Sequence, residues 1–195
     1  MTKRLALLTL VLIAAGCGGA KKAVISPPAP HNDGDIISPS AAPSFLLRDQ
    51  AGKLVGPQQD RGHWTIVTFL YTHCPDVCPL VTNQLVAAQR VDADLRVIAV
   101  SVDPKRDTTA AVRHFLAVHH AGPRFRYVIG STAKLSHVWL LYHVASTPGP
   151  QGTVTHSTFE ILVDPKGRER VFFDSRVTAH DVTSMLAHLN KGATA

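Results

Sequence analysis

Two cysteines stand close together in the segment "THCPDVCPL" at residues 72–80, and each is followed by a proline. Three residues separate Cys74 from Cys78. A thiol pair at this spacing could form a structural disulfide, act as a redox couple or bind a metal ion. The thiolate is both the attacking form in disulfide exchange and the form that binds metals. The residue types alone therefore leave all three chemistries open.

The two prolines indicate where the helix after this motif begins. Proline disfavours the helical conformation in the residue before it, but it is tolerated in the first turn of a helix. We therefore expect the helix at residues 77–91 to begin inside the motif. Both sulfurs would then lie near free backbone N–H groups at the positive end of the helix dipole, which lowers the pKa of a thiol.

The spacing of the pair favours some chemistries over others. A disulfide needs sulfurs about 2.05 Å apart, whereas two thiolates that share one metal stand about 4 Å apart. Three intervening residues give the second sulfur more room than the two of a Cys-X-X-Cys redox motif. The spacing therefore permits a metal without requiring one. A static disulfide would close a very short loop and stabilise the fold little.

A metal site needs a third ligand, and His156 is the candidate. Most of the eleven histidines fall in or beside predicted helices, and His73, next to Cys74, is expected to point away from it. His156 ends a loop rich in Thr, Pro and Gly at residues 145–155 and precedes the strand "STFEILVD". Two thiolates and one imidazole form a soft donor set that suits Cu(I), with Cu(II) as a second possibility. Zinc would want a fourth ligand in a closed site, and none is evident.

Strands and helices alternate along the part of the chain that must position these residues. The segment "WTIVTFLYT" at residues 64–72 is typical of a strand buried on both faces. Asp107 and Ser131 are expected to cap two later helices, and Thr178 with Asp181 opens the last one. Further strands are predicted at residues 95–103, 124–130, 157–164 and 170–174, the last two joined by a turn at 164–167.

This order predicts an α/β fold with a mixed central sheet flanked by helices. A hairpin is expected at residues 45–56, before the first central strand. A cysteine pair at the start of the helix after that strand, together with a closing hairpin and helix, resembles the thioredoxin fold. The expected fold is thus thioredoxin-like, with an N-terminal β-hairpin extension.

The first residues have the pattern of an export signal. Lys3 and Arg4 precede an apolar stretch at residues 5–15, which is too short to span a bilayer and is typical of a signal peptide. The sequence Ala-Ala-Gly-Cys at 14–17 resembles a bacterial lipoprotein cleavage site, which predicts a lipoprotein signal peptide at residues 1–16 and a lipid on Cys17. We therefore expect the protein at the cell membrane, lipid-anchored on the extracytoplasmic (periplasmic) side.

Composition divides the remainder of the chain into a tether and one domain. Residues 17–42 are rich in Gly, Ala, Pro and Ser and poor in hydrophobic residues, which predicts a disordered tether. Residues 43–195 then form a single domain, since a chain of 195 residues supports one sizeable core. The formal charge of +6 is scattered, without a basic run. We expect no binding to nucleic acid.

Three segments resemble, in order and spacing, the SCO/SenC family of copper-binding proteins involved in cytochrome c oxidase assembly. They are "FLYTHCPDVCPL" at 69–80, "SVDPKRDT" at 101–108 and "THSTFEILVDPKG" at 155–167. The resemblance implies a thioredoxin-like fold in which Cys74, Cys78 and His156 bind copper. It also implies delivery of that copper to CuA, the dinuclear centre of cytochrome c oxidase subunit II. We assign no ligand role to Asp76 or Asp103, which are expected to shape turns beside the site.

The leading hypothesis is a membrane-anchored metallochaperone, rather than an enzyme, that binds one copper ion and passes it on by ligand exchange. The alternative is a thiol-disulfide oxidoreductase that keeps the CuA cysteines reduced, with Cys74 attacking, Cys78 resolving and a thiol reductant protein as a possible partner. A copper store or sensor would fit the same site. Because imidazole must be neutral to bind, copper affinity is expected to weaken below roughly pH 6.5.

Overall fold

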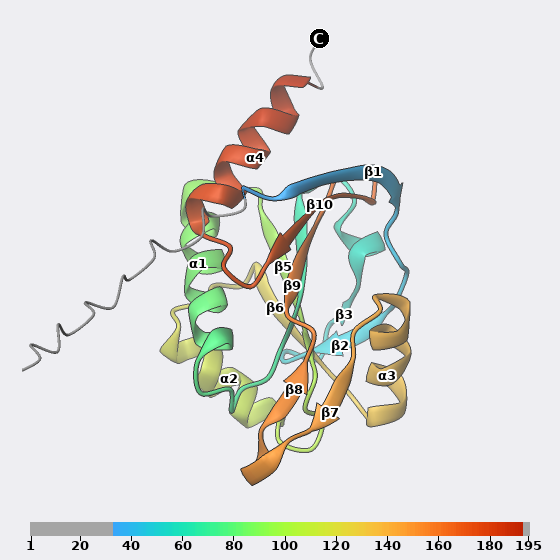
Figure 1. Ribbon diagram of the computed structural model, residues 1–195, viewed down its shortest axis with the longest axis vertical. Helices are drawn as coiled ribbons and strands as arrows, with labels where there is room; N and C mark the ends of the chain where they lie inside the picture. Colours follow the sequence, from blue (N-terminus) through green and yellow to red (C-terminus); the bar gives the residue numbers. More distant parts are fainter. Residues whose placement is uncertain (1–32, 193–195) are drawn as a thin grey trace, which may run out of the picture. The chain divides into compact units, whose positions relative to one another are not determined.

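The computed structural model describes residues 33–192 (Figure 1). The predicted signal peptide at 1–16, the predicted lipid site Cys17 and most of the predicted tether lie outside this range. The main sheet contains β1 (Asp35–Ala41), β2 (Leu47–Asp49), β3 (Leu54–Val55), β4 (Thr65–Leu70), β5 (Arg96–Ser101), β6 (Phe125–Ile129), β9 (Phe159–Val163) and β10 (Arg168–Asp174). The helices are α1 (Val77–Val91), α2 (Thr109–Val118), α3 (Thr132–Leu141) and α4 (Ala179–Gly192).

The eight strands are ordered β1-β10-β9-β4-β5-β6-β2-β3. The central strands β4, β5 and β6 pair in parallel, whereas β9 pairs antiparallel with β4 and β2 pairs antiparallel with β6. The predicted hairpin of β2 and β3 is therefore confirmed, and it extends one edge of the sheet. The whole is the mixed α/β sheet of a thioredoxin-like fold, as predicted.

Helices cover both faces of this sheet. The crossovers from β4 to β5 and from β5 to β6 step in the same direction, so right-handed connections place α1 and α2 on one face. Figure 1 shows α4 beside α1, with α3 on the other side of the sheet. Strand β4 is buried along its whole length, as its run of β-branched and aromatic residues predicts for a strand covered on both faces.

The structure corrects the boundary of the predicted tether. Residues 35–41 form β1, which pairs antiparallel with β10 at the edge of the sheet. We expected these residues in the tether because they include only two large hydrophobic residues, Ile36 and Ile37. An edge strand is held mainly by backbone hydrogen bonds to its neighbour, which composition does not reveal. The domain therefore begins before residue 43.

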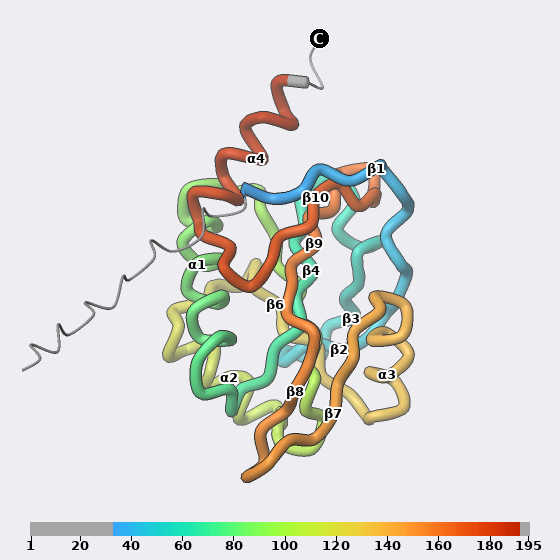
Figure 2. The backbone as a smooth tube through the Cα atoms, viewed as in Figure 1, coloured from blue at the N-terminus to red at the C-terminus, as the bar shows by residue number. Residues whose placement is uncertain are grey.

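The structure also corrects two local predictions. Thr108, rather than Asp107, is the N-cap of α2, and its hydroxyl accepts a hydrogen bond from the Ala111 amide. The expected loop at residues 145–155 contains β7 (Ser146–Pro148) and β8 (Val154–His156), which pair as a small second sheet. Figure 2 shows this β7–β8 hairpin projecting beyond the main sheet.

The predicted capping of α4 is confirmed. The Asp181 carboxylate accepts a hydrogen bond from the Thr178 amide at 2.7 Å, and the Thr178 hydroxyl accepts one from the Asp181 amide at 3.2 Å. This reciprocal pair satisfies two backbone donors at the start of the helix. Val182, Met185 and Leu186 are buried behind it, as the helical spacing predicts.

Candidate metal centre

The two cysteines lie at the entrance of α1, where the chain leaves β4. The Cys74 amide donates to the Tyr71 carbonyl oxygen at 3.3 Å, which closes a tight turn after the strand. Asp76 is the N-cap of α1, and its carboxylate accepts a hydrogen bond from the Val77 amide. The helix thus begins inside the motif, as predicted, and Asp76 shapes its start.

The two thiols form a hydrogen-bonded pair. The Cys78 amide donates to the Cys74 sulfur at 3.3 Å, and the Cys74 sulfur also lies 3.6 Å from a carboxylate oxygen of Asp76. Cys78 is fully buried, Cys74 is partly exposed, and neither forms a disulfide. Cys74 is therefore the sulfur that solvent, copper or a partner protein meets first.

The pair divides one negative charge unequally. The hydrogen bond from Cys78 lowers the pKa of Cys74 to about 6, with help from the backbone amides of Cys78 and Asp76. The same hydrogen bond and burial raise the pKa of Cys78 far above the ordinary thiol value. At neutral pH, Cys74 is therefore a thiolate that accepts a hydrogen bond from the protonated Cys78.

His156 ends β8 with its imidazole in a defined tautomer. Its Nδ1 lies 2.8 Å from the Ser157 carbonyl oxygen. A carbonyl oxygen only accepts hydrogen bonds, so Nδ1 carries the hydrogen and Nε2 keeps its lone pair. Burial lowers the pKa of this imidazole. His156 is thus a neutral imidazole at physiological pH, with Nε2 as its donor atom.

Tyr71 connects the histidine to the cysteines. The rings of Tyr71 and His156 meet edge-on, with their centroids 5.7 Å apart. The Tyr71 carbonyl oxygen in turn accepts the hydrogen bond from the Cys74 amide. Tyr71 therefore contacts both the cysteine turn and the β7–β8 hairpin.

Of the three predicted ligands, Cys74 and Cys78 are in direct contact, and His156 contacts the neighbouring residue Tyr71. Within residues 33–192, no three side chains of His, Cys, Asp or Glu are already grouped closely enough to hold a metal ion. Cys74 and Cys78 are in contact, and His156 is linked to them through Tyr71. His73 is exposed, and its Nδ1 lies 2.9 Å from the Thr72 hydroxyl.

The sequence did not predict a role at the site for two residues behind it, Arg106 and Asp107. The Arg106 guanidinium lies 5.9 Å from the centre of the Tyr71 ring and is paired with the Asp103 carboxylate. Asp107 accepts hydrogen bonds from the backbone and side chain of Thr72. Arg106 and Asp107 both belong to "SVDPKRDT". The segment was therefore identified by its resemblance to the family, but the contacts that these two residues make behind the site were not predicted. Asp103, expected to shape a turn, orients Arg106.

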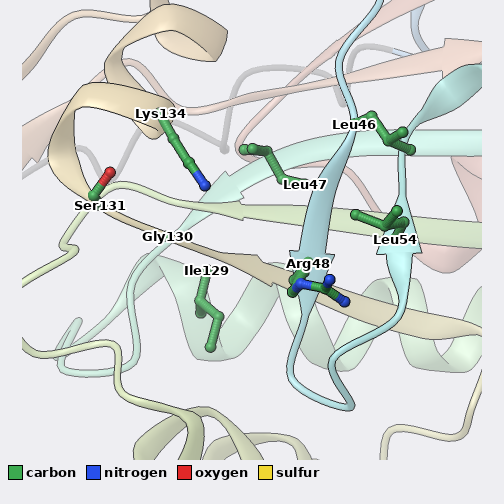
Figure 3. Close-up of a pocket in the computed structure, with 8 residues that line it drawn as sticks. All are labelled: Leu46, Leu47, Arg48, Leu54, Ile129, Gly130, Ser131 and Lys134. Carbon is green, nitrogen blue, oxygen red and sulfur yellow. The ribbon is translucent and has the colours of Figure 1, made fainter.

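Two hollows in the described part of the chain are lined by residues other than the predicted ligands. A hollow of about 370 Å³ at the β2–β6 edge is lined by Leu47, Leu54 and Ile129, with Arg48 and Lys134 at its rim (Figure 3). Another, of about 380 Å³, lies between the β7–β8 hairpin and the loop that carries Asp103. The candidate metal centre is instead a surface position at the helix entrance. None of the helices described at residues 33–192 has the length and apolar character needed to cross a membrane.

Known proteins share this arrangement of elements. Arabidopsis thaliana ScoI, solved with copper bound, is 26% identical and superposes with a TM-score of 0.70, covering 78% of this chain and 99% of that one. Bradyrhizobium japonicum ScoI, also solved with copper bound, is 30% identical with a TM-score of 0.63, covering 76% of this chain and 99% of the other. Both likenesses extend over the domain described here.

Sequence comparison gives the same result. The mitochondrial SCO2 homolog of Bos taurus is 30% identical over 150 residues, which are 71% of this chain and 56% of the bovine protein. This chain therefore spans little more than half the length of that relative. The family model described as SCO1/SenC matches residues 36–191, from the first strand to the last helix. The chain belongs to the SCO1/SenC family.

Proposed function

We propose that this protein is an extracytoplasmic copper chaperone that binds one copper ion through Cys74, Cys78 and His156. In this proposal it delivers the ion to the CuA site of cytochrome c oxidase subunit II. The observation that carries the proposal is the cysteine pair at the entrance of α1, one a thiolate and the other a protonated thiol, with a neutral imidazole in edge-on contact with the neighbouring Tyr71 ring. Family membership and the copper-bound relatives support it.

The donor set fits copper as cargo. Two sulfurs and one imidazole suit Cu(I), which accepts low coordination and soft ligands. Cys74 is already a thiolate at neutral pH, so it meets the ion first, and Cys78 joins after losing its proton. The Ser157 carbonyl holds the His156 tautomer that leaves Nε2 free, as a hydrogen-bonded outer shell does at metal sites.

Binding in this proposal includes a movement of the β7–β8 hairpin or of Tyr71. His156 ends β8, a three-residue strand that pairs only with β7 in the part of the chain described, outside the main sheet. A short hairpin of this kind can shift at little cost compared with a strand of the core. Moving His156 past the Tyr71 ring would complete the ligand set, and the reverse movement would release the ion.

The predicted anchor suits this role. A lipid on Cys17, followed by the tether, would hold the domain at the extracytoplasmic surface of the membrane. The family resemblance implies that CuA receives its copper there. The tether is then residues 17 to about 34, since β1 begins at Asp35.

Copper titration of the reduced full chain tests the proposed ligands. Wild-type protein should bind one equivalent of Cu(I) in competition with a chelator. Cys74→Ser, Cys78→Ser and His156→Ala should each weaken binding by more than about tenfold, since the loss of a hydrogen-bonded partner of a ligand already costs about that much. His137→Ala is the control, because His137 is an exposed residue of α3. Binding by His156→Ala that equals the wild type would remove the histidine from the site.

A thiol-disulfide oxidoreductase is the second candidate, favoured by the low pKa of Cys74 beside a protonated thiol. The Cys74 thiolate would attack a substrate disulfide and form a mixed disulfide. Cys78, after losing its proton, would then displace the substrate's second sulfur, so that two electrons pass from the pair to the substrate. This reaction does not need His156. Retained disulfide reduction by His156→Ala, together with unchanged oxidase assembly, would favour this candidate over the chaperone.

A further inference from the structure

The carboxylate of Asp107 is buried behind the metal centre and accepts four hydrogen bonds. Its Oδ1 accepts from the Thr72 amide at 2.9 Å and from the Thr72 hydroxyl at 2.7 Å. Its Oδ2 accepts from the Ser101 hydroxyl at 2.6 Å and from the Tyr127 hydroxyl at 3.0 Å. Asp107 is only 4% exposed. A buried carboxylate is tolerated when its oxygens are satisfied in this way.

The four donors come from three neighbouring strands. Thr72 follows β4, Ser101 is the last residue of β5, and Tyr127 lies inside β6. Asp107 thus ties the end of β4, which carries the cysteine motif, to the two strands beside it. Those strands are fixed by the core, because Tyr127 and Ser101 are both fully buried.

Thr72 is the residue through which this anchoring reaches the sulfurs. The turn from Tyr71 to Cys74 is closed by the hydrogen bond between its first carbonyl and its last amide. Thr72 is the second residue of that turn, and its amide points to Asp107 rather than to solvent. Fixing this amide fixes the direction in which the turn presents Cys74.

The preceding residue acts on the same turn from a second side. Arg106 lies over the ring of Tyr71, the first residue of the turn. Arg106 and Asp107 therefore hold two successive residues, Tyr71 and Thr72, that lead directly into the cysteine motif. Beyond the turn, the Cys74 sulfur is held by the Cys78 amide at 3.3 Å.

We propose that Asp107 is a positioning residue for the metal centre, which holds the Cys74 sulfur where it can share one ion with Cys78. The proposal rests on the proposed function and adds to it a residue whose hydrogen bonds go to Thr72, Ser101 and Tyr127 rather than to either sulfur. Asp107 acts through Thr72: loss of the carboxylate frees the turn, and Cys74 then samples directions in which the two sulfurs do not converge. Copper affinity is then lowered, because part of the binding free energy is used to order the turn when the ion binds.

The reduced full chain tests this with Cu(I) affinity and with the absorption that sulfur-bound Cu(II) gives. Asp107→Ala should lower Cu(I) affinity about tenfold or more and shift the absorption. Asp107→Asn keeps the shape and one acceptor oxygen, so it should recover part of the affinity. Thr72→Val keeps the amide hydrogen bond to Asp107 and loses those of the hydroxyl, to Asp107 and to His73 Nδ1, so it should have a small effect. The matched control is Thr108→Ala, which removes the cap of α2 next to Asp107 without touching the turn.

The outcomes separate positioning from general stability. Thr108→Ala should lose stability, as cap removals do, while its copper affinity and spectrum stay those of the wild type. If Asp107→Ala matches Thr108→Ala in copper affinity and spectrum, the positioning role is wrong. Should Asp107→Ala fail to fold, the same comparison is made with Asp107→Asn. If wild-type protein binds no copper, the proposed function fails instead.

A second readout does not depend on copper. In equilibrium with glutathione, oxidised glutathione takes two electrons from the cysteine pair, which becomes a disulfide while two glutathione thiols form. A freed Cys74 turn should lower the equilibrium constant for disulfide formation about tenfold, or about 30 mV for this two-electron couple. An unchanged constant in both Asp107 variants would contradict the positioning role whatever the copper result.

Discussion

At the scale of single residues, Cys78 carries the proton that copper has to displace. Cys74 has a pKa of about 6 and is already a thiolate at pH 7.5, whereas the pKa of buried Cys78 is raised. Cu(I) binding at pH 7.5 should therefore release about one proton, whereas two unperturbed thiols would release nearly two. Calorimetry in buffers of different ionisation enthalpy measures this number. Cys78→Ser should release close to none, and a release near two would show that the pair does not share its charge.

The pH dependence of copper affinity follows from the same residues. Burial lowers the pKa of His156 below its ordinary value of 6.5, so proton competition at the imidazole begins at lower pH than the sequence alone predicts. Cys74, with a pKa of about 6, takes up a proton in the same range. Because binding also displaces the Cys78 proton, affinity should already fall about tenfold per pH unit between pH 7.5 and 6.5, and more steeply below about pH 6 as Cys74 and His156 take up protons. A chelator competition series from pH 7.5 to 4 measures this, and a flat profile down to pH 4 would contradict the ligand set.

Glu160 should make the stability of the fold depend on pH. It is fully buried in β9, where its Oε1 accepts a hydrogen bond from Thr68 at 3.2 Å, and its Oε2 has no partner among the described residues. Burial raises its pKa to about 8. The neutral form is therefore favoured by folding, and stability is lost as pH rises from about 4.5 to 8, by up to about 1.4 kcal/mol per pH unit.

The Glu160→Gln variant isolates this effect. It keeps the shape of the side chain and cannot ionise, so its free energy of unfolding should change less with pH across that range. Urea denaturation at pH 5, 6, 7 and 8 compares the two proteins. Curves that stay parallel from pH 5 to 8 would mean that Glu160 is accommodated as a carboxylate.

At the level of secondary-structure elements, substitution of Gly34 tests whether β1, the strand that composition did not predict, packs on β10. Gly34 has φ +95°, and a Cβ added there would stand 2.5 Å from the Phe173 ring and 2.7 Å from Val171 in β10. Gly52, in the β2–β3 turn, also has positive φ, but its added Cβ would meet nothing within 4 Å. Both alanine variants bear the backbone cost of about 1 kcal/mol, and Gly34→Ala should lose about 1–3 kcal/mol more because it overpacks the core.

Thermal unfolding of the two variants measures the difference. Because the Gly52 variant controls for backbone strain, the extra loss in the Gly34 variant reports the packing of β1 on β10. Equal losses would mean that the chain before residue 42 does not pack on the sheet, as the tether prediction had it.

Elements with a strong local pattern were predictable, and elements held by their neighbours were not. The buried run of β4, the helix start inside the cysteine motif and the capping of α4 each depend on nearby residues, and each was predicted. Strand β1 and the β7–β8 hairpin are short or polar and depend on pairing with residues that a periodicity does not identify. Asp107 was predicted as a cap because aspartate before a helix usually is one, yet burial among Thr72, Ser101 and Tyr127 gives it a different task.

The candidate site shows the same division. The cysteine pair follows from spacing, whereas the link from Cys74 through Tyr71 to His156 joins two segments far apart in sequence and became visible only in the folded chain. His156 could be named from the sequence as a candidate ligand, whereas the movement that the proposed site requires could not. In the proposed function, that movement would couple copper binding to the β7–β8 hairpin.

At the scale of the whole molecule, the chaperone hypothesis predicts a defect in the oxidase rather than in the copper supply. Cells that lack this protein should assemble oxidase with little CuA absorption, because in this hypothesis the protein itself presents copper to subunit II. Added copper should restore part of the signal by direct loading. Wild-type protein should restore all of it, and the Cys74→Ser and His156→Ala proteins should restore little, since each lacks a ligand.

The histidine variant decides between the two functions in the same cells. An oxidoreductase needs only the cysteine pair, so His156→Ala would then restore CuA as well as the wild type, and added copper would not help, because oxidised CuA cysteines bind no copper. A chaperone gives the opposite pair of results. His137→Ala, with an exposed imidazole on α3, should restore CuA in either case and shows that the loss of a histidine is not in itself harmful. The copper requirement and the histidine requirement must therefore appear together for the chaperone hypothesis to hold.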